Sequence, residues 1–579
     1  MEDHLMDDVD RLHVGIDFGT TFTGIAFVEA ALVKDPTQAT LRHITTITEW
    51  AGSPYAISKV PSVIAYDPED PDSVHAWGSG VSAGMEEAYS WLKMHLNDDV
   101  ASTKYDIVMD TGAAKSIRVG TNELPEGKSA VDVIADFLKK VHEHLLSELA
   151  RLLTQAYLDG TPITFVLTVP ATFSDKAKND IIAAMKMAGF NNRASDLLRL
   201  VTEPEAAMIA TLVHFSKGRV KKSIPRNSAV ILGDLGGGTI DFVTYYIADN
   251  TTNTELRELV PGQGAKSGSI FVNQAFYEWA CNKFDFETAK MLFGSTMRLD
   301  KGQSAIPFDV RFAGPPEYDR KTRSMMITDE TMKSFFQKPV ENILGLLQDQ
   351  LDAAGQAISE REWEVVPKVE TVVLAGGFGT SPYVRQCVQD WCDSNDLQML
   401  HTDEPRSATL QGAVLWSLDP FKVTSRKARR HYGFSRDEPF DENFDDPERK
   451  IEKGQEVPED EPITRDSSMT GWASAPDTFQ DRIELYCSDA DIAPRYKQEA
   501  NFVGYMEVDF SRIPRKDLDK KQVKMTRGRK IKSTTNYLVE YKIELVMDSK
   551  AGVLKYKVIA GGKGEPKTVA TKDINYSLS

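Results

Sequence analysis

Val14–Thr21 reads Val-Gly-Ile-Asp-Phe-Gly-Thr-Thr, and Val230–Thr239 reads Val-Ile-Leu-Gly-Asp-Leu-Gly-Gly-Gly-Thr. In each stretch an apolar run ends at an aspartate, and glycine and threonine residues follow. An apolar run that stops at a glycine turn is typical of a strand leading into a tight loop. One such loop, taken alone, can be a plain hairpin turn. The two loops together predict that the protein has two related halves, which close around one phosphate group.

The residue types in both loops suit a phosphate with a divalent cation. Glycines have no Cβ, so backbone N–H groups can approach an anion closely; these residues are Gly19, Gly236, Gly237 and Gly238. Hydroxyl groups come from Thr20, Thr21 and Thr239. Asp17 and Asp234 would repel phosphate unless a cation lay between them, and Mg²⁺ prefers carboxylate, water and phosphate oxygens. Each loop therefore predicts phosphate together with Mg²⁺.

Length and composition limit the class of protein. With 579 residues the chain is too long for one hydrophobic core, and its net charge of −18 argues against a nucleic-acid binder. The four cysteines have no metal-ligand spacing and are expected to be small buried hydrophobes in a reducing compartment. Residues 1–10 are acidic and are expected to be disordered, without a secretory signal. No apolar run reaches the length of a membrane span, so we expect a cytosolic or nuclear protein.

Strand and helix patterns alternate through the first 420 residues, which predicts an α/β fold. Leu12 to Ala30 and Ser228 to Ile247 each predict strand, loop and strand, and further strands are expected at Val60–Tyr66, Ile163–Val169 and Val369–Leu374. Helices are expected at Ser129–Leu153, Asp175–Gly189 and Asp329–Ala357, and a third glycine loop at Ala375–Gly379 precedes another helix. That loop suits close approach to a ribose or purine, although glycine is also common in such turns for packing alone.

The composition changes near residue 425. Asp437 to Pro462 carries twelve acidic and three basic residues, so 426–470 is interpreted as an acidic, proline-containing linker or loop. Short alternating runs over 471–579 predict a small antiparallel β domain. Within it Arg512 to Lys532 has ten basic and two acidic residues, which favours a solvated hairpin loop or a contact with an acidic partner.

Five motifs in order give the chain a family resemblance. Besides the two aspartate–glycine loops they are Thr168-Val-Pro-Ala-Thr-Phe173, Thr202-Glu-Pro-Glu-Ala-Ala207 and Ala375-Gly-Gly-Phe378. Their order and spacing over about residues 11–420 resemble the ATPase domain of the seventy-kilodalton heat-shock chaperones, within the superfamily of actin and hexokinase. The Gly-Gly-Phe variant and the C-terminal pattern look more like the divergent branch of member twelve and its fungal relatives.

The resemblance implies a two-lobed, actin-like ATPase built from duplicated ribonuclease-H-like lobes over 11–425. Lobe I would comprise about 11–215 with 405–420, and lobe II about 226–400. The cofactors implied are ATP or ADP with Mg²⁺, and the reaction is ATP and water to ADP and phosphate.

Residue roles follow position by position from the resemblance. Thr20 and Thr21 would hold the β- and γ-phosphates, Thr239 would touch the γ-phosphate, and Asp17 and Asp234 would hold the water shell of Mg²⁺. The expected catalytic residues are Lys93, Glu203, Asp234 and Asp241. Of these, Lys93 would orient the attacking water, with a surface helix lysine as the alternative, and Asp241 would polarise the water. Gly268 would start a phosphate-facing helix, Gly376 and Gly377 would contact the adenosine, and Pro170 would relay the nucleotide state or simply end a strand.

The chain departs from the family pattern in two places. The familiar linker of leucines and aspartates is replaced by a basic stretch, Asp419–His431, which puts the coupling of ATP to substrate release in doubt. No residues that would bind the adenine base can be recognised between Phe276 and Arg323. Three functions stay open: a weak chaperone-like ATPase that binds a polypeptide client, with or without co-chaperones; a nucleotide-gated scaffold with little turnover; and a small-molecule kinase, for which no sugar-binding signature is visible. The oligomeric state is not predicted.

Overall fold

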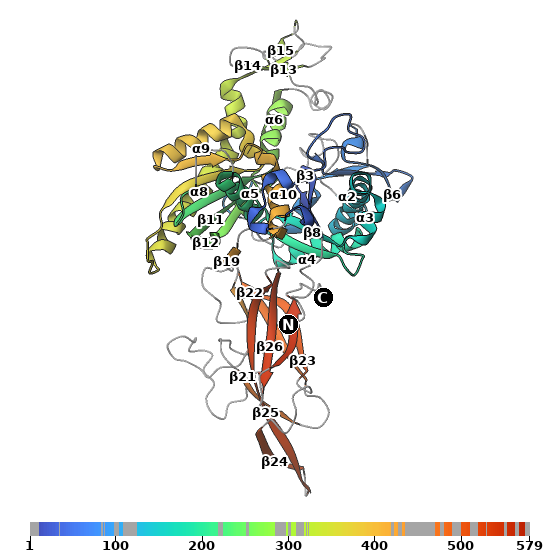
Figure 1. Ribbon diagram of the computed structural model, residues 1–579, viewed down its shortest axis with the longest axis vertical. Coiled ribbons are helices and arrows are strands. Elements are labelled where there is room, and N and C mark those ends of the chain that lie inside the picture. Colours follow the sequence, from blue (N-terminus) through green and yellow to red (C-terminus); the bar gives the residue numbers. More distant parts are fainter. Residues whose placement is uncertain are drawn as a thin grey trace. The chain divides into compact units, whose positions relative to one another are not determined.

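The computed structural model describes residues 11–33, 35–82, 85, 87–97, 103–107, 124–217, 224–249, 254–283, 297–298, 303–307, 318–319, 321, 324–418, 422–425, 431–434, 469–474, 480–488, 500–509, 519–527, 530–548, 553–561 and 567–573. They fall into two compact units, Met1–Lys427 and Ala428–Ser579 (Figure 1). The expected disorder of 1–10 lies outside the described residues.

Lobe I is built on a mixed sheet with strand order β3-β2-β1-β8-β9, in which β4 also pairs with β2. The strands are β1 (Leu12–Phe18), β2 (Phe22–Glu29), β3 (Thr45–Thr46), β4 (Val60–Pro61), β8 (Ile163–Val169) and β9 (Leu197–Thr202). The hairpin β1–β2 is antiparallel, whereas β1–β8 and β8–β9 are parallel. All seven residues of β8 are buried, as expected for an apolar strand covered on both faces.

Lobe II repeats this arrangement in a sheet with the order β18-β17-β10-β11-β12-β19. Its strands are β10 (Ser228–Leu235), β11 (Ile240–Asp249), β12 (Thr254–Ala265), β17 (Val369–Ala375), β18 (Gln398–His401) and β19 (Lys422–Ser425). Again the hairpin β10–β11 is antiparallel, and β10–β17 and β17–β18 are parallel. The prediction of an α/β fold with two related, actin-like lobes is therefore confirmed.

Helices cover the sheets, and their limits follow from local sequence. Helix α2 (Ala130–Leu153) begins at Ser129, whose side chain caps it together with Asp132, and buries a stripe of residues four apart from Val133 to Leu149. The other helices on these lobes are α3 (Gln155–Gly160), α4 (Asp175–Met187), α6 (Ile270–Lys283), α8 (Asp329–Ser359) and α9 (Pro382–Ser394). The bounds of α2, α4 and α8 agree with the expected helices within a few residues, and α9 is the helix expected after the third glycine loop; α3 was not predicted.

Two helices lie in the core between the lobe sheets. They are α5 (Glu203–Lys217) and α10 (Pro405–Leu418), and residues of both join a buried cluster that includes strands of both lobes. The two helices cross closely because Gly412 has no side chain: a Cβ there would lie 1.8 Å from the Ala206 carbonyl oxygen. Near this crossing α10 also packs against β1 and β8.

The strand expected at Val60–Tyr66 is divided at Ser62 into β4 and β5 (Val63–Asp67). Pro61 cannot donate a ladder hydrogen bond, and the Ser62 N–H bonds to the Thr21 carbonyl instead. The Ser62 hydroxyl donates to the Gly19 carbonyl at 2.8 Å. Strand β5 then enters a second sheet with β6 (Asp70–Trp77) and β7 (Ala88–Ser90). The break in the strand therefore places Ser62 where its side chain hydrogen-bonds to the first glycine loop.

The rest of lobe II and the C-terminal unit contain short antiparallel sheets. A four-stranded one in lobe II has β13 (Met297–Arg298), β14 (Gln303–Pro307), β15 (Tyr318–Asp319) and β16 (Ser324–Thr328). The C-terminal unit has one sheet of β20 (His431–Phe434), β22 (Gln480–Ser488) and β23 (Asn501–Asp509). Its second sheet has β21 (Met469–Ser474), β24 (Asp519–Arg527), β25 (Lys530–Asp548), β26 (Val553–Gly561) and β27 (Lys567–Asp573).

This C-terminal unit confirms the small, mainly β domain but differs from the sequence in detail. Residues His431–Phe434, inside the expected linker, form β20 and pair with β22. The basic stretch expected as a loop contains strand β24, which pairs with β25 along nine residues. In both places pairing outweighs a polar local composition: β20 pairs with the distant strand β22, and β24 pairs with β25, the next strand along the chain. The acidic part of the expected linker lies outside the residues described.

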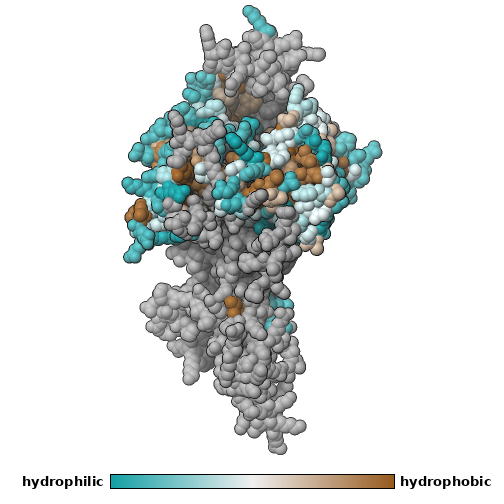
Figure 2. All heavy atoms as spheres, viewed as in Figure 1, coloured by the Kyte–Doolittle hydropathy of each residue, from teal (hydrophilic) through white to brown (hydrophobic). Residues whose placement is uncertain are grey.

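Three further observations concern membrane-spanning helices, the hydropathy of the surface and the cysteines. Within the part of the chain that the structure describes, no helix is long and apolar enough to cross a membrane. On the face shown in Figure 2, hydrophilic residues cover much of the described N-terminal unit, with hydrophobic residues in patches between them. Cys392 is buried and Cys387 half-buried, and both are free thiols, as expected.

Candidate functional site

The two aspartate–glycine loops, from opposite lobes, lie against each other. A Cβ on Gly237 would fall 2.4 Å from the Thr21 hydroxyl, and one on Gly238 would fall 2.6 Å from the Thr20 hydroxyl. Real side chains do not approach so closely, so only glycine allows the lobe II loop to meet both threonines. The sequence-predicted loop residues are therefore brought together at one place between the lobes.

Both loops close with the same hydrogen bond. The Gly19 N–H donates to the Phe22 carbonyl, and the Gly236 N–H donates to the Thr239 carbonyl, each at 3.0 Å. Gly268 lies behind the second loop rather than facing a cavity, because its N–H donates to the Gly238 carbonyl at 3.1 Å. A Cβ on Gly268 would lie 2.3 Å from the Gly237 carbonyl oxygen, so this position also needs glycine.

Asp17 and Asp234 lie buried at the ends of β1 and β10. Asp17 accepts hydrogen bonds from the Lys59 ammonium at 2.5 Å and from the Thr168 hydroxyl at 3.2 Å. Asp234 accepts one from the Thr409 hydroxyl at 3.1 Å. Burial, together with the nearby charges of Asp17 and Asp241, raises the pKa of Asp234 to about 7. A cation placed between these carboxylates would reverse that effect.

Lys93 and Glu203 form a buried ion pair beside the first loop. The Lys93 ammonium, in the short helix η5 (Leu92–Asn97), contacts the Glu203 carboxylate and donates to the Phe18 carbonyl at 2.7 Å. Only 4% of Lys93 is exposed, so it is not a surface helix lysine. Burial raises the pKa of Glu203; Lys93 opposes this, and Asp234 and Asp17 reinforce it.

Asp241 is the last of the buried acids in this region. Its Oδ1 accepts from the Thr172 hydroxyl at 3.2 Å and the Thr172 N–H at 3.3 Å. Its Oδ2 is buried and has no hydrogen-bond partner, and burial raises the pKa of the group. A buried carboxylate oxygen without a partner is costly unless a ligand or water satisfies it.

A cavity of 670 Å³, called here the large cavity, opens between the lobes at these loops. Most of the expected residues line it: Asp17, Gly19, Thr20, Thr21, Lys93, Glu203, Asp234, Gly236, Gly237, Gly238, Thr239, Gly376 and Gly377. Asp241 and Gly268 are not among its lining residues. The volume lies within the usual range of small-molecule sites.

The third glycine loop forms part of the same wall. Gly376 has a φ of +80°, and a Cβ there would lie 2.4 Å from the Asp234 Oδ1. Gly377 differs, since a Cβ on it would meet no atom within 4 Å. Gly376 is therefore needed for packing, whereas the missing side chain at Gly377 leaves room in the cavity itself.

Sequence reasoning missed several lining residues, among them Lys59, Ser269, Phe378, Arg406 and Thr409. Phe378 and Ser269 adjoin glycines already singled out, so proximity to the motifs could have identified them. No local pattern marks Arg406 or Thr409, which reach the cavity because α10 lies between the lobes. The range searched for adenine contacts, Phe276 to Arg323, lies largely outside the described residues.

The residues fit a phosphate better than a directly bound metal. The glycine cradle, the threonine hydroxyls and two lysines offer donors to an anion. Among the described side chains, no group of three or more His, Cys, Asp or Glu is arranged to hold a metal ion. The arrangement suits Mg²⁺ that keeps its water and phosphate ligands, with carboxylates around them.

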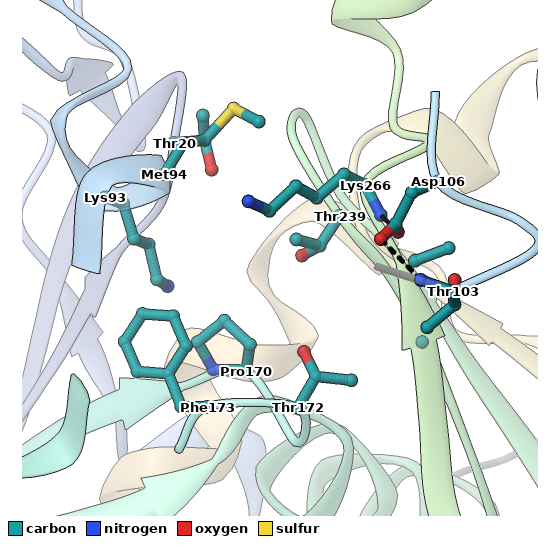
Figure 3. A pocket seen from close by; sticks show the side chains of 12 residues that line it. Thr20, Lys93, Met94, Thr103, Asp106, Pro170, Thr172, Phe173, Thr239 and Lys266 are labelled. Carbon is teal, nitrogen blue, oxygen red and sulfur yellow. Dashed lines mark hydrogen bonds between the residues drawn. The ribbon is translucent and has the colours of Figure 1, made fainter. Parts of the chain in front are cut away.

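A second, smaller cavity adjoins the first and is called here the small pocket. Its volume is 60 Å³, and Thr20, Lys93 and Thr239 line both cavities and so separate them. The remaining lining residues are Met94, Thr103, Asp106, Pro170, Thr172, Phe173, Gly264, Ala265 and Lys266 (Figure 3). Pro170 directly follows β8 and thus both ends a strand and faces a cavity.

Comparison with known proteins agrees with this architecture. The family model of the Hsp70 protein matches residues 53–258. Heat shock 70 kDa protein 12A of Mus musculus is 24% identical over 523 residues, covering 74% of each chain. Heat shock 70 kDa protein 12B of Homo sapiens is 22% identical, covering 72% of this chain and 70% of the relative.

A bacterial relative extends the likeness beyond that subgroup. Chaperone protein DnaK of Psychrobacter cryohalolentis is 23% identical over 426 residues, covering 69% of this chain and 58% of its own. The expected family resemblance is confirmed. The chain is similar to the Hsp70 protein family over residues 53–258 and, over about three quarters of its length, to heat shock 70 kDa proteins 12A and 12B.

Proposed function

We propose that this protein binds ATP with Mg²⁺ in the large cavity, hydrolyses it slowly, and uses lobe closure to control the binding of a polypeptide. The observation that carries the proposal is the contact of Gly237 and Gly238 with Thr21 and Thr20 across the lobes. A phosphate chain held there touches both lobes at once, so the loss of its terminal group changes what holds them together.

Each polar residue has a proposed part in phosphate transfer to water. Thr20, Thr21 and Thr239 would donate to the phosphates, and Asp17 and Asp234 would hold the water shell of Mg²⁺. Bound Mg²⁺ would neutralise charge on the phosphate oxygens. Gly376 and Gly377 would lie against the adenosine. Asp241 would polarise the attacking water through its unpartnered Oδ2. The water would reach that oxygen from the side of Thr172.

Lys93 and Glu203 would act on the reacting atoms. The water oxygen attacks the γ-phosphorus, the bond from that phosphorus to the bridging oxygen breaks, and ADP and phosphate form, with the water protons passing to phosphate and solvent. Lys93 would steady the charge on the transferred group while Glu203 keeps its ammonium in place.

A second candidate is a nucleotide-gated scaffold with little turnover. The observation that favours it is the Lys59 ammonium on Asp17, a carboxylate that the ATPase needs for the Mg²⁺ water shell. If Lys59 keeps that contact when ATP binds, the nucleotide would be held but poorly activated. The polypeptide client, any co-chaperone and a cytosolic or nuclear location remain predictions under either candidate.

Turnover by the purified full chain separates these proposals. We expect slow release of phosphate from ATP that unfolded peptide accelerates, and loss of turnover in Lys93→Ala and Asp234→Ala. Lys128→Ala is the control, because Lys128 pairs with Asp136 outside both cavities. Normal turnover in either active-site variant would contradict that residue's role. Turnover indifferent to peptide, with partners retained only in ATP, would support the scaffold.

A further inference from the structure

The basic stretch of the C-terminal unit forms a two-stranded ribbon, which the proposed ATPase does not use. The ribbon consists of β24 and the first residues of β25, Lys530–Thr535, and is called here the basic ribbon. Strands β21 and β26 pair with β25 only from Asn536 onward. Among the described strands, Gln522–Arg527 and Lys530–Thr535 therefore pair only with each other, over a length of roughly 20 Å. In Figure 1 this part extends beyond the other strands of its unit.

The basic ribbon carries charge of one sign. From Lys520 to Thr535 the sequence contains seven lysine and arginine residues and no aspartate or glutamate. Alternate positions along a strand share a face. Lys521 and Arg527 therefore fall on one face of β24, and Lys520 and Lys524 fall on the other. Both faces of the ribbon are positively charged.

This distribution of charge does not stabilise the ribbon by itself. The register places Arg527 directly opposite Lys530, and like charges at opposed positions destabilise a strand pair. A two-stranded hairpin without further strands is also marginally stable in water. A third strand of negative charge would correct both deficits, because it adds backbone hydrogen bonds and neutralises the repulsion.

The edge of β24 that faces away from β25 is available for such a strand. Among the described strands, β24 pairs with β25 alone, so the backbone groups on its other side have no strand partner there. An extended polypeptide segment can add to an open edge through main-chain hydrogen bonds. Lysines on the edge repel a second copy of the same strand and pair favourably with aspartate or glutamate across the ladder. Protection of the edge alone would not require charge of a single sign from Lys520 to Arg527.

The order of residues on β24 indicates which segment would fit. Val523 and Met525 are two residues apart and share a face with Lys521 and Arg527, one on each side of them. An acidic segment with apolar residues at alternate positions matches this order. A nucleic acid has no backbone amides to continue the ladder, and a flat anionic membrane would meet only one of the two charged faces.

We propose that the open edge of β24 is a docking site for an acidic, extended segment of a partner protein, which adds to the basic ribbon as a third strand. The proposal goes beyond the ATPase function and does not rest on it, since the ribbon lies in the C-terminal unit and the nucleotide site in the N-terminal one.

Fluorescence anisotropy with the full chain tests the site. The probe is a labelled nine-residue peptide of alternating glutamate and valine, and the comparison peptide has lysine in place of glutamate. We expect saturable binding of the glutamate peptide, at least about tenfold tighter than that of the lysine peptide, and weaker binding as salt is added. No binding of the glutamate peptide, or equal binding of both peptides, would overturn the proposal.

Paired substitutions locate the binding. Lys521→Gln with Lys524→Gln removes one charge from each face and should weaken binding about fivefold, whereas Lys521→Arg with Lys524→Arg should leave it nearly unchanged. The matched control is Lys567→Gln with Lys572→Gln, which removes two charges from β27, a strand that pairs with β26 and not with the ribbon. Equal weakening in the two glutamine variants would show general attraction by the C-terminal unit and would overturn the site.

Hydrogen exchange separates an added strand from attraction by charge alone. The bound glutamate peptide should slow amide exchange in segments covering β24 and leave β27 unchanged. Binding without protection of β24 would contradict strand addition. Oligo(dT) and phosphatidylserine vesicles are tested beside the peptide. Tighter binding of either one, with the same dependence on Lys521 and Lys524, would assign the ribbon to that polyanion and refute a polypeptide partner.

Discussion

The Lys59 ammonium lies 2.5 Å from Asp17 Oδ2, inside the cavity where the phosphates of ATP are proposed to bind. It is a tethered positive charge among four buried carboxylates, those of Asp17, Asp234, Asp241 and Glu203. Together with Lys93 it offsets part of the repulsion that a phosphate chain would meet there. We therefore expect Lys59 to reduce the dependence of ATP binding on Mg²⁺.

Replacing Lys59 with methionine is expected to increase the need for Mg²⁺. Without the tethered charge, affinity for ATP in the presence of a chelator should fall about tenfold more than affinity with Mg²⁺. Titration of a fluorescent ATP analogue under both conditions measures this ratio. Lys128→Met is a suitable control, since Lys128 is similarly buried and ion-paired with Asp136 at 3.1 Å. Equal weakening of Lys59→Met under both conditions would show that Lys59 does not substitute for cation charge.

Gly377→Val is expected to block the ligand without harming the fold. Gly377 has φ −68° and ψ −37°, which valine can adopt, and its added side chain would project into open space in the large cavity. We expect ATP affinity to fall at least about tenfold while the free energy of unfolding changes by less than about 0.5 kcal/mol. Calorimetric titration and urea unfolding measure the two quantities. Gly355→Val is the control, because Gly355 also has open space around it but lies on α8, outside the large cavity; its ATP affinity should be unchanged. Normal ATP affinity in Gly377→Val would show that the nucleotide does not bind beside Gly377.

The stability of lobe I should fall in acid because of His13 on β1. Burial lowers the pKa of His13 to about 4, with Arg11 and Arg199 adding to the shift, and its Nδ1 lies 2.8 Å from the Ser417 hydroxyl. The unfolded chain takes up a proton near pH 6.5 and the folded one only near pH 4, so stability present above pH 6.5 is lost as the pH falls through this window. The upper limit is about 3 kcal/mol, and the half-buried ring makes the effect smaller.

His13→Gln removes that titration, so the stability difference between wild type and variant should shrink from pH 7 to pH 4.5. Urea unfolding followed by tryptophan fluorescence provides the comparison. A difference that stays constant over this range would show that His13 does not become protonated on unfolding in the way its burial predicts.

The sequence predicted elements where local pattern and tertiary structure agree. Both hairpins, the buried strand β8 and helix α2 follow from unbroken apolar runs, a serine cap and residues four apart. The site residues within the loops could be predicted because each glycine and threonine follows its aspartate closely in the sequence.

Residues brought in from a distance were not predictable. Lys59, which directly precedes β4, contacts Asp17 from 42 residues further along the chain, and Thr409 reaches Asp234 from a helix 175 residues away. Strand β20 was not predicted because its partner β22 lies far along the chain, whereas β24 pairs with the next strand, β25, and its basic composition hid the strand pattern.

Hydrogen exchange with and without ATP and Mg²⁺ tests most directly whether both loops bind one nucleotide. The account predicts that ATP slows amide exchange in peptides covering Gly19–Thr21 and in peptides covering Gly236–Thr239, at one ATP per chain. AMP, which lacks the β- and γ-phosphates, should protect neither loop to the same extent. Protection of one loop alone, or of neither at saturating ATP, would contradict a phosphate site shared by the two lobes.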